Sequence, residues 1–258
     1  MENKSTFFDF AAEVGLTKHI GGIEATQAIL KYCHINADSY ILDVGCGVGV
    51  TPCYIAKNYG CRVVGVDIVE KMVERGRERA LKEKVADRVE FRVADAQDLP
   101  FEDNLFDAVI TESVTAFPED KQKAVNEYAR VTRLGGYVGL NESTWLKYPP
   151  PQEMIDWASQ EIGSSVSPLT PDEWTALLEN AGLHDITTKT SSIDLKDESK
   201  AILKRYGFGG FMKVLGRMLK LYFRDPDYQA FVKKVKEEGV TPDNLDVYFG
   251  YGLYIGQK

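Results

Sequence analysis

Ile41-Leu42-Asp43-Val44-Gly45-Cys46-Gly47-Val48-Gly49-Val50 is a short apolar run that passes into glycines at alternate positions. A β-branched apolar run predicts a buried strand, and the glycines after it let the backbone turn tightly and approach a ligand. A strand, a glycine-rich loop and a helix, in this order, form the nucleotide-binding turn of many α/β sheets. The stretch therefore predicts an α/β fold with a nucleotide-type site at this turn.

Further apolar segments follow this first strand, and segments with helical periodicity separate them. The predicted later strands cover 62–67, 88–93, 106–111, 137–141, 186–193 and 248–255, and the predicted helices after the first, second and fourth strands cover 51–59, 69–84 and about 120–132. Strands that alternate with helices at this spacing predict a doubly wound, mostly parallel, seven-stranded α/β sheet.

Acidic residues stand at the ends of several predicted strands. Asp67 ends the second, Asp95 follows the third and Glu112 follows the fourth. Ligands of doubly wound sheets bind beyond the carboxyl ends of the strands, near the point where the strand order reverses. We therefore expect these three acids and Gly45 to surround one crevice.

The composition indicates one domain, 1–258, that acts on a small molecule. The chain has 258 residues, of which 44% are hydrophobic, and its formal net charge is −8. This charge argues against binding to phosphate backbones, which requires a basic face, and it favours a small-molecule substrate over a nucleic acid. We find no apolar stretch of the roughly 20 residues that span a bilayer and no secretory leader, and we expect a cytoplasmic protein.

The cysteines give no sign of a metal site. They show no CxxC spacing and no cluster of histidines near them, so we expect reduced thiols and no metal. The four cysteines are Cys33, Cys46, Cys53 and Cys61. Cys46 has no neighbouring base, and we interpret it as a small packing residue.

The spacing of the glycines limits which class of ligand the loop can bind. A dinucleotide fold normally shows GxGxxG, whereas this loop reads GxGxG with Asp43 two residues before the first glycine. An acid there disfavours a pyrophosphate and favours a ligand with an ammonium or sulfonium centre. Asp67 is placed to accept hydrogen bonds from ribose hydroxyls, and Asp95 with Ala96 to meet an adenine edge.

Together these motifs resemble a known family. They are Leu42 to Gly49, Val66-Asp67, Ala94-Asp95-Ala96 with Leu99-Pro100-Phe101, Phe106 to Val109 and Arg130 to Gly136. The chain is similar, over roughly residues 15–145, to the class I S-adenosylmethionine-dependent methyltransferases, and within them to the small-molecule branch of the ubiquinone and menaquinone C-methyltransferases. Leu134 departs from the proline usual before the paired glycines, which alters a turn and leaves the cofactor assignment intact.

The resemblance implies a Rossmann-like methyltransferase fold with S-adenosylmethionine as methyl donor and S-adenosylhomocysteine as product. It implies a cofactor-binding core, 1–146, with helical cap segments at 147–168 and 196–246. It also implies a set of cofactor contacts. These are the backbone of Gly45, Cys46 and Gly47 around the methionine portion, Asp67 on the ribose, Ile68 and Met72 beside the adenine, Asp95 and Ala96 on its edge, and His19-Ile20-Gly21-Gly22 over the methionine end. Asp43 and Glu112 join the cofactor-binding candidates.

Three residues are candidates for acid–base chemistry: His19, Glu112 and Glu142. A carbon or oxygen nucleophile needs a base, whereas a nitrogen or sulfur nucleophile needs only to lose its proton. His19 equally fits a buried or surface histidine without a chemical role. Asp107 begins a strand away from the crevice, and we interpret it as structural.

The segment 200–236 reverses the charge balance of the chain. It holds ten Lys or Arg against two Asp, with large apolar residues from Phe208 to Tyr222 at helical spacing. Three interpretations stay open: a lid over the substrate, contact with a membrane or lipid, and a protein-binding face. Gly207, Gly209 and Gly210 are candidates for a hinge.

Two other functions fit part of this pattern. A non-catalytic S-adenosylmethionine-binding protein would carry the same binding motifs. An NAD-dependent oxidoreductase shares the fold type, but the glycine spacing and the lack of an evident Tyr-x-x-x-Lys pair argue against it.

Overall fold

The computed structural model describes residues 7–15, 17, 19–162, 168–193, 195–238 and 242–258. Parts of both predicted cap segments lie outside this range: 163–167 of the segment 147–168, and 194 and 239–241 next to or within the segment 196–246.

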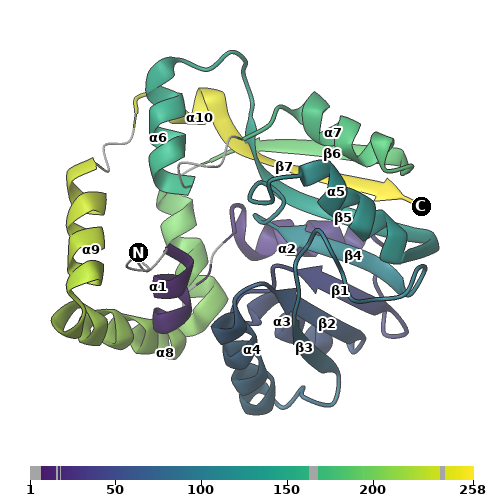
Figure 1. Cartoon of the computed structure of the whole chain (residues 1–258), viewed down its shortest axis with the longest axis horizontal. Coiled ribbons are helices and arrows are strands. Elements are labelled where there is room, and N and C mark those ends of the chain that lie inside the picture. The colour runs from purple at the N-terminus through teal and green to yellow at the C-terminus, as the bar shows by residue number, and fades with distance from the viewer. Residues whose placement is uncertain (1–6, 16, 18, 163–167, 194, 239–241) are drawn as a thin grey trace.

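A seven-stranded sheet forms the centre of the fold, in the order β3-β2-β1-β4-β5-β7-β6 (Figure 1). The strands from β3 to β5 are parallel, and β7 runs antiparallel to both of its neighbours. The prediction of a mostly parallel α/β sheet is confirmed. The strands are β1 (Tyr40–Val44), β2 (Arg62–Asp67), β3 (Val89–Val93), β4 (Phe106–Glu112), β5 (Thr132–Trp145), β6 (His184–Ser192) and β7 (Phe249–Gln257).

Helices cover both faces of the sheet and extend beyond one of its edges. One apolar cluster joins α2, α3 and α4 to the sheet, and a second joins α5 and α7 to its other face. Helices α1, α6, α8 and α9 lie beyond the carboxyl ends of the parallel strands (Figure 1). The helices are α1 (Phe7–Val14), α2 (Gly22–Tyr32), α3 (Val50–Tyr59), α4 (Glu70–Glu83), α5 (Lys121–Val131), α6 (Gln152–Ile162), α7 (Pro171–Asn180), α8 (Leu195–Arg224), α9 (Pro226–Glu238) and α10 (Leu245–Tyr248).

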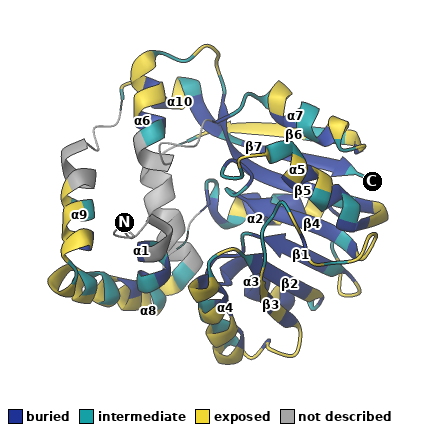
Figure 2. Ribbon diagram, viewed as in Figure 1, coloured by how far each residue is buried: buried dark blue, intermediate teal, exposed yellow. Residues whose placement is uncertain are grey.

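The central strands are buried on both faces, as Figure 2 shows. Ile41 belongs to the cluster of one face and Leu42 to that of the other, because successive side chains of a strand point in opposite directions. A strand covered by helices on both sides must be apolar at every position, which explains the continuous apolar run in the sequence.

Strand β5 shows the largest difference from its predicted bounds. Strand β5 begins at Thr132 and ends at Trp145, longer than the predicted 137–141, because Tyr137 to Trp145 pair with β7. Helices α8 and α9 together cover the basic segment 200–236, and α8 is broken at Gly207, where φ is 65°. This break lies at the first of the three glycines predicted as a hinge.

None of the helices among the described residues is long and apolar enough to cross a membrane. In the same part of the chain, no three His, Cys, Asp or Glu side chains are grouped so that they could hold a metal ion.

Candidate active site

The loop between β1 and α3 depends on three glycines in left-handed backbone conformations. Their φ angles are 71° at Gly45, 52° at Gly47 and 75° at Gly49. Side chains other than glycine rarely adopt these angles. The loop is held against the sheet by a hydrogen bond from the Cys46 N–H to the Val66 carbonyl at 2.9 Å. The alternate glycines are therefore required by the path of the backbone.

We expect Gly45→Ala to destabilise the protein more than Gly135→Ala. Both glycines have a positive φ, but a Cβ at Gly45 would lie 2.2 Å from Cγ2 of Val114, whereas a Cβ at Gly135 meets nothing within 4 Å. The shared backbone strain costs about 1 kcal/mol, and we expect the contact with Val114 to add about as much again. Urea unfolding of both variants measures the difference. Equal losses would show that Val114 moves aside freely.

Asp67, at the end of β2, holds the same loop by a hydrogen bond to its backbone. Its Oδ2 accepts a hydrogen bond from Gly47 N and its Oδ1 one from Val69 N, both at 2.9 Å. Burial raises the pKa of this carboxyl group, and the backbone N–H groups around it oppose that effect. A carboxylate accepts about four hydrogen bonds, so Asp67 keeps capacity for a further donor.

The residues predicted beside the adenine occupy different environments. Ile68 is 67% exposed, directly after Asp67, and is free to face a ligand. Met72 is 2% exposed and packs in a cluster with Val48 and Val50. Asp95 follows β3, and its Oδ1 accepts a hydrogen bond from Gln97 N at 2.8 Å. Ala96, next in the chain, is half-buried.

Glu112, the last residue of β4, is the centre of a buried polar network. Its Oε1 accepts a hydrogen bond from the hydroxyl of Thr26 at 2.8 Å, and its Oε2 one from the hydroxyl of Thr51 at 2.9 Å. Nε2 of His19 lies 3.4 Å from Oε2 of Glu112 and 3.3 Å from Oγ1 of Thr26. All four side chains are buried. The network connects the N-terminal segment, α2, α3 and β4.

Asn141 of β5 joins the His19 segment to the sheet. Its Nδ2 donates a hydrogen bond to the Ile20 carbonyl at 2.8 Å and lies 3.3 Å from Nδ1 of His19. The Ile20 N–H donates to the Ser113 hydroxyl at 3.3 Å. Gly21 packs so closely on the Tyr251 ring that a Cβ there would lie 2.7 Å away, and Gly22 begins α2. The segment 19–22 is thus attached to the carboxyl edge of the sheet.

Glu142 is fully buried in β5 and holds the loop that follows β4. Its Oε1 accepts hydrogen bonds from Val114 N at 3.0 Å and Thr115 N at 2.7 Å. Burial raises the pKa of Glu142 to about 7, against the effect of these N–H donors. Because Val114 packs on Gly45, the carboxyl group of Glu142 supports the glycine loop through the loop 113–116.

Asp43 and Cys46 lie within the core of the site. Asp43 is 2% exposed in β1, and Cys46 is buried directly after Gly45. Burial, with the charges of Asp43 and Asp67, raises the pKa of the Cys46 thiol well above its usual range. The thiol is therefore protonated near neutral pH, which agrees with a packing residue and not with a nucleophile.

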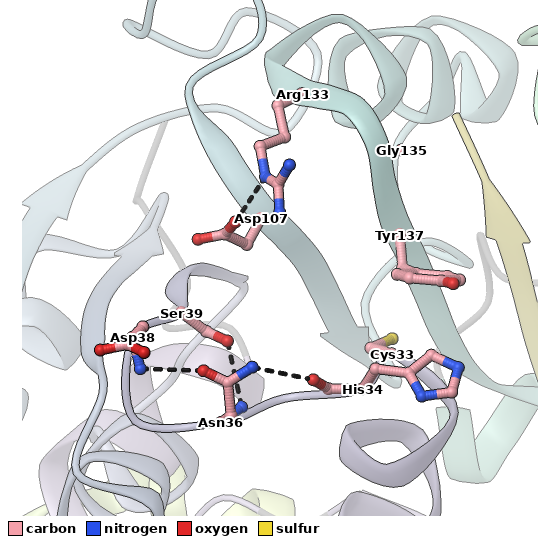
Figure 3. A pocket seen from close by; sticks show the side chains of 9 residues that line it. All are labelled: Cys33, His34, Asn36, Asp38, Ser39, Asp107, Arg133, Gly135 and Tyr137. Atoms are coloured by element: carbon pink, nitrogen blue, oxygen red, sulfur yellow. Dashed lines mark hydrogen bonds and ion pairs between the residues drawn. The ribbon is translucent and has the colours of Figure 1, made fainter.

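Asp107 lies at the opposite edge of the sheet, as predicted. It accepts a hydrogen bond from Tyr40 N at 2.6 Å and forms an ion pair with Arg133. Asp107 and Arg133 line a pocket of about 330 Å³ near the amino ends of β1 and β4 (Figure 3). This pocket is separate from the crevice, because the two lie at opposite ends of the parallel strands.

The structure thus brings the strand-end acids and the His19 segment to one edge of the sheet. The sequence did not single out Thr26 and Thr51, the two hydroxyl donors to Glu112. Thr51 directly follows the residue that begins α3, close after the glycine loop, and this position was the available signal. Thr26 lies on α2, and its position in the sequence gave no signal of a role in the site.

Part of the chain that forms this site matches a known protein family. Residues 42–140, which run from β1 through the parallel strands to β5, match the family described as "Methyltransferase domain". This part of the chain therefore resembles a methyltransferase domain. A structural neighbour, Haemonchus contortus phosphoethanolamine N-methyltransferase 2, is described in complex with S-adenosyl-L-methionine, the cofactor that the resemblance implies for this chain.

Individual relatives agree with this assignment. The chain is 37% identical to 27-O-demethylrifamycin SV methyltransferase of Amycolatopsis mediterranei over 61% of this chain and 58% of the relative. Its fold is similar to Haemonchus contortus phosphoethanolamine N-methyltransferase 2 in complex with phosphomonomethylethanolamine and S-adenosylhomocysteine, with a TM-score of 0.72, 21% identity and coverage of 99% and 58%. It is also similar to the [4+2]-cyclase SpnF, with a TM-score of 0.71, 17% identity and coverage of 96% and 92%. The chain spans less than two thirds of both methyltransferases.

The residues at this edge fit S-adenosylmethionine. The carboxylates of Asp43, Asp67 and Glu112 lie at the carboxyl ends of adjacent strands, so the edge carries negative charge that suits a sulfonium cation. Asp67 retains acceptor capacity for ribose hydroxyls. The carboxyl edge of the sheet therefore carries acceptor groups that match the charge and the hydroxyl groups of this cofactor.

Proposed function

We propose that this protein transfers a methyl group from S-adenosylmethionine to a small-molecule acceptor that binds between the carboxyl edge of the sheet and the cap helices. The observation that carries the proposal is Asp67, whose carboxylate organises the glycine loop and keeps capacity for a ligand donor. When bound, the sulfonium group supplies an electrophilic methyl for in-line attack by a nucleophile. Most of the rate acceleration then comes from orientation and from exclusion of water.

Different residues around the site bind different parts of the cofactor. The backbone of Gly45, Cys46 and Gly47 holds the methionine portion, Asp67 the ribose, and Ile68, Asp95 and Ala96 the adenine. Met72 acts from within the core, as packing beneath this part of the site, because its side chain is buried. Gly21 and Gly22 allow the segment that begins at His19 to lie close over the methionine end.

Of the three acid–base candidates, we assign to His19 the role of base toward an oxygen or carbon nucleophile, because histidine is the side chain that most often has this role. Both oxygens of Glu112 are occupied by threonine hydroxyls, and Oε1 of Glu142 is occupied by backbone N–H groups. Glu112 and Glu142 are then positioning residues, the first for His19 and the second for the loop 113–116.

We propose as acceptor a neutral or weakly charged small molecule with an apolar portion, such as a lipid or a quinone-like compound. Support comes from the cap helices, which lie beyond the strand ends (Figure 1) and include apolar side chains such as Met154 and Trp157 of α6. The relative from Amycolatopsis mediterranei is named for 27-O-demethylrifamycin SV, whereas the Haemonchus neighbour is in complex with phosphomonomethylethanolamine. The similarity to ubiquinone and menaquinone C-methyltransferases stays a prediction.

A panel assay tests the proposal. Release of S-adenosylhomocysteine is measured with phenols, quinols, alkaloid amines and phosphoethanolamine, and we expect turnover with a phenol or quinol. In His19→Gln, turnover of that acceptor is expected to fall on the order of 100-fold, while the affinity for S-adenosylhomocysteine stays within a few-fold of wild type. An equal loss of both quantities would assign His19 to cofactor binding.

A non-catalytic binding protein is the second candidate function. The similarity to SpnF, described as a [4+2]-cyclase, shows that this fold also occurs in a protein whose described reaction is not methyl transfer. Tight binding of S-adenosylhomocysteine without turnover of any acceptor in the panel would favour it. Tighter binding of NADH than of S-adenosylhomocysteine would instead favour an oxidoreductase.

A further inference from the structure

The second half of α8, after the break at Gly207, exposes a continuous apolar stripe. Its residues fall at spacings of three or four positions, apart from two adjacent pairs, so they lie on one face of the helix. Their exposed fractions run from 37% to 77%, which is high for large apolar side chains. The stripe consists of Phe208, Phe211, Met212, Leu215, Leu219, Tyr222 and Phe223.

A neighbouring face of the same helix is already packed on the protein. Val214 is 4% exposed, and Met218 and Leu221 pack against Phe10 and Tyr228, which belong to α1 and α9. Helix α8 therefore has two apolar faces, of which one contributes to the core of the cap. The second is not needed to hold the helix in place and has no covering element among the described residues.

Positive charge borders the exposed stripe. Lys213, Lys220 and Arg224 are exposed, and their helical positions place them along one side of it. The sequence has no Asp or Glu from Lys200 through Arg224, in a chain whose net charge is −8. Lys82 of α4 adds to this border, because the nearby charge of Lys213 lowers its pKa. Cations held this close to one another favour an anion between or beside them.

We propose that residues 208–224 of α8 bind the surface of an anionic lipid bilayer. The stripe inserts among the upper acyl chains while Lys213, Lys220 and Arg224 contact lipid phosphates, as in amphipathic helices that lie in the membrane interface. Tyr222 suits the headgroup level, where its ring and hydroxyl meet different surroundings. A second copy of the chain fits less well, because pairing two stripes would bring two cationic borders together.

Vesicle sedimentation tests this binding without any use of the enzymatic reaction. Vesicles of phosphatidylcholine alone are compared with vesicles that contain about 30% phosphatidylglycerol, both at low salt. We expect at least about tenfold stronger partitioning to the anionic vesicles, and a large loss of it at about 0.5 M salt, because salt screens the lysine contacts. Equal partitioning to both kinds of vesicle would overturn the proposal.

Substitutions inside and outside the stripe distinguish vesicle binding through the stripe from nonspecific binding through any exposed apolar side chain. Phe223→Gln is compared with Leu134→Gln, since the two side chains are 77% and 75% exposed. We expect the first to weaken vesicle binding roughly fivefold and the second to leave it unchanged. Both positions are exposed, so folding is expected to persist, and thermal melting followed by circular dichroism checks it.

The charged border is tested in the same way. The triple variant Lys213→Gln, Lys220→Gln, Arg224→Gln is expected to lose the preference for anionic vesicles, by about tenfold or more. Its control removes three exposed lysines elsewhere, namely Lys31, Lys57 and Lys123. Equal losses in both triple variants would assign the effect to net charge and reject the α8 surface. A dimer in sedimentation equilibrium that Phe223→Gln dissociates would identify a second copy as the occupant and would also reject the proposal.

Discussion

Asp67→Ala is expected to lower the affinity for S-adenosylhomocysteine by about 100-fold or more, measured by isothermal titration calorimetry. Hydrogen bonds to a charged group contribute about 1.5 to 3 kcal/mol each, so the loss of two ribose contacts corresponds to at least about two orders of magnitude. The substitution also releases Gly47 N and Val69 N, which both bond to this carboxylate. Both losses act on the cofactor site.

Asp67→Asn and Asp87→Asn complete this experiment. The asparagine at position 67 keeps one acceptor oxygen, and its affinity is expected to fall between those of wild type and Asp67→Ala. Asp87 is an exposed aspartate whose side chain is 73% accessible, and its variant is expected to bind as wild type does. Binding by Asp67→Ala within about threefold of wild type would remove Asp67 from the site and with it the main support for the proposed function.

Glu142→Gln is expected to raise the free energy of unfolding near pH 8 by up to about 3 kcal/mol relative to wild type. In the folded protein, burial raises the pKa of Glu142 to about 7, from a usual value of 4.5. The folded state therefore keeps a proton that the unfolded state releases between these two pH values. The contribution of Glu142 to the stability of wild type is greatest below about pH 4.5, and it decreases as the pH rises toward 7.

Urea unfolding at pH 5 and pH 8 measures this linkage. Glutamine is neutral at both pH values and keeps a carbonyl oxygen for the N–H groups of Val114 and Thr115, so the advantage of the variant is expected at pH 8 and to be small at pH 5. All other titrating groups are common to both proteins and cancel in the difference. The exposed Glu102→Gln variant is the matched control, with a difference that does not change between the two conditions. A constant difference for Glu142→Gln would show that its carboxyl group is ionised throughout.

The local pattern of the chain was sufficient to predict the sheet and the cofactor edge. Ile41 and Leu42 are apolar because helices cover both faces of β1, and the following glycines turn the chain into α3. Such requirements act within a few residues, so they are visible in the sequence. The length of β5 was not predictable in this way, because it depends on pairing with β7, which lies about a hundred residues later.

The sequence by itself determined the fold class, the glycine loop and the strand-end position of Asp67. Only the tertiary structure decided how the other site residues are used. Glu112 meets Thr26 and Thr51 across distances of 86 and 61 residues in the chain, and Glu142 reaches back to the loop after β4. It likewise decided which apolar face of α8 is packed and which is exposed. The physical reason is that backbone conformation is set by neighbours in sequence, whereas burial and side-chain partners are set by elements that meet only when the chain is folded.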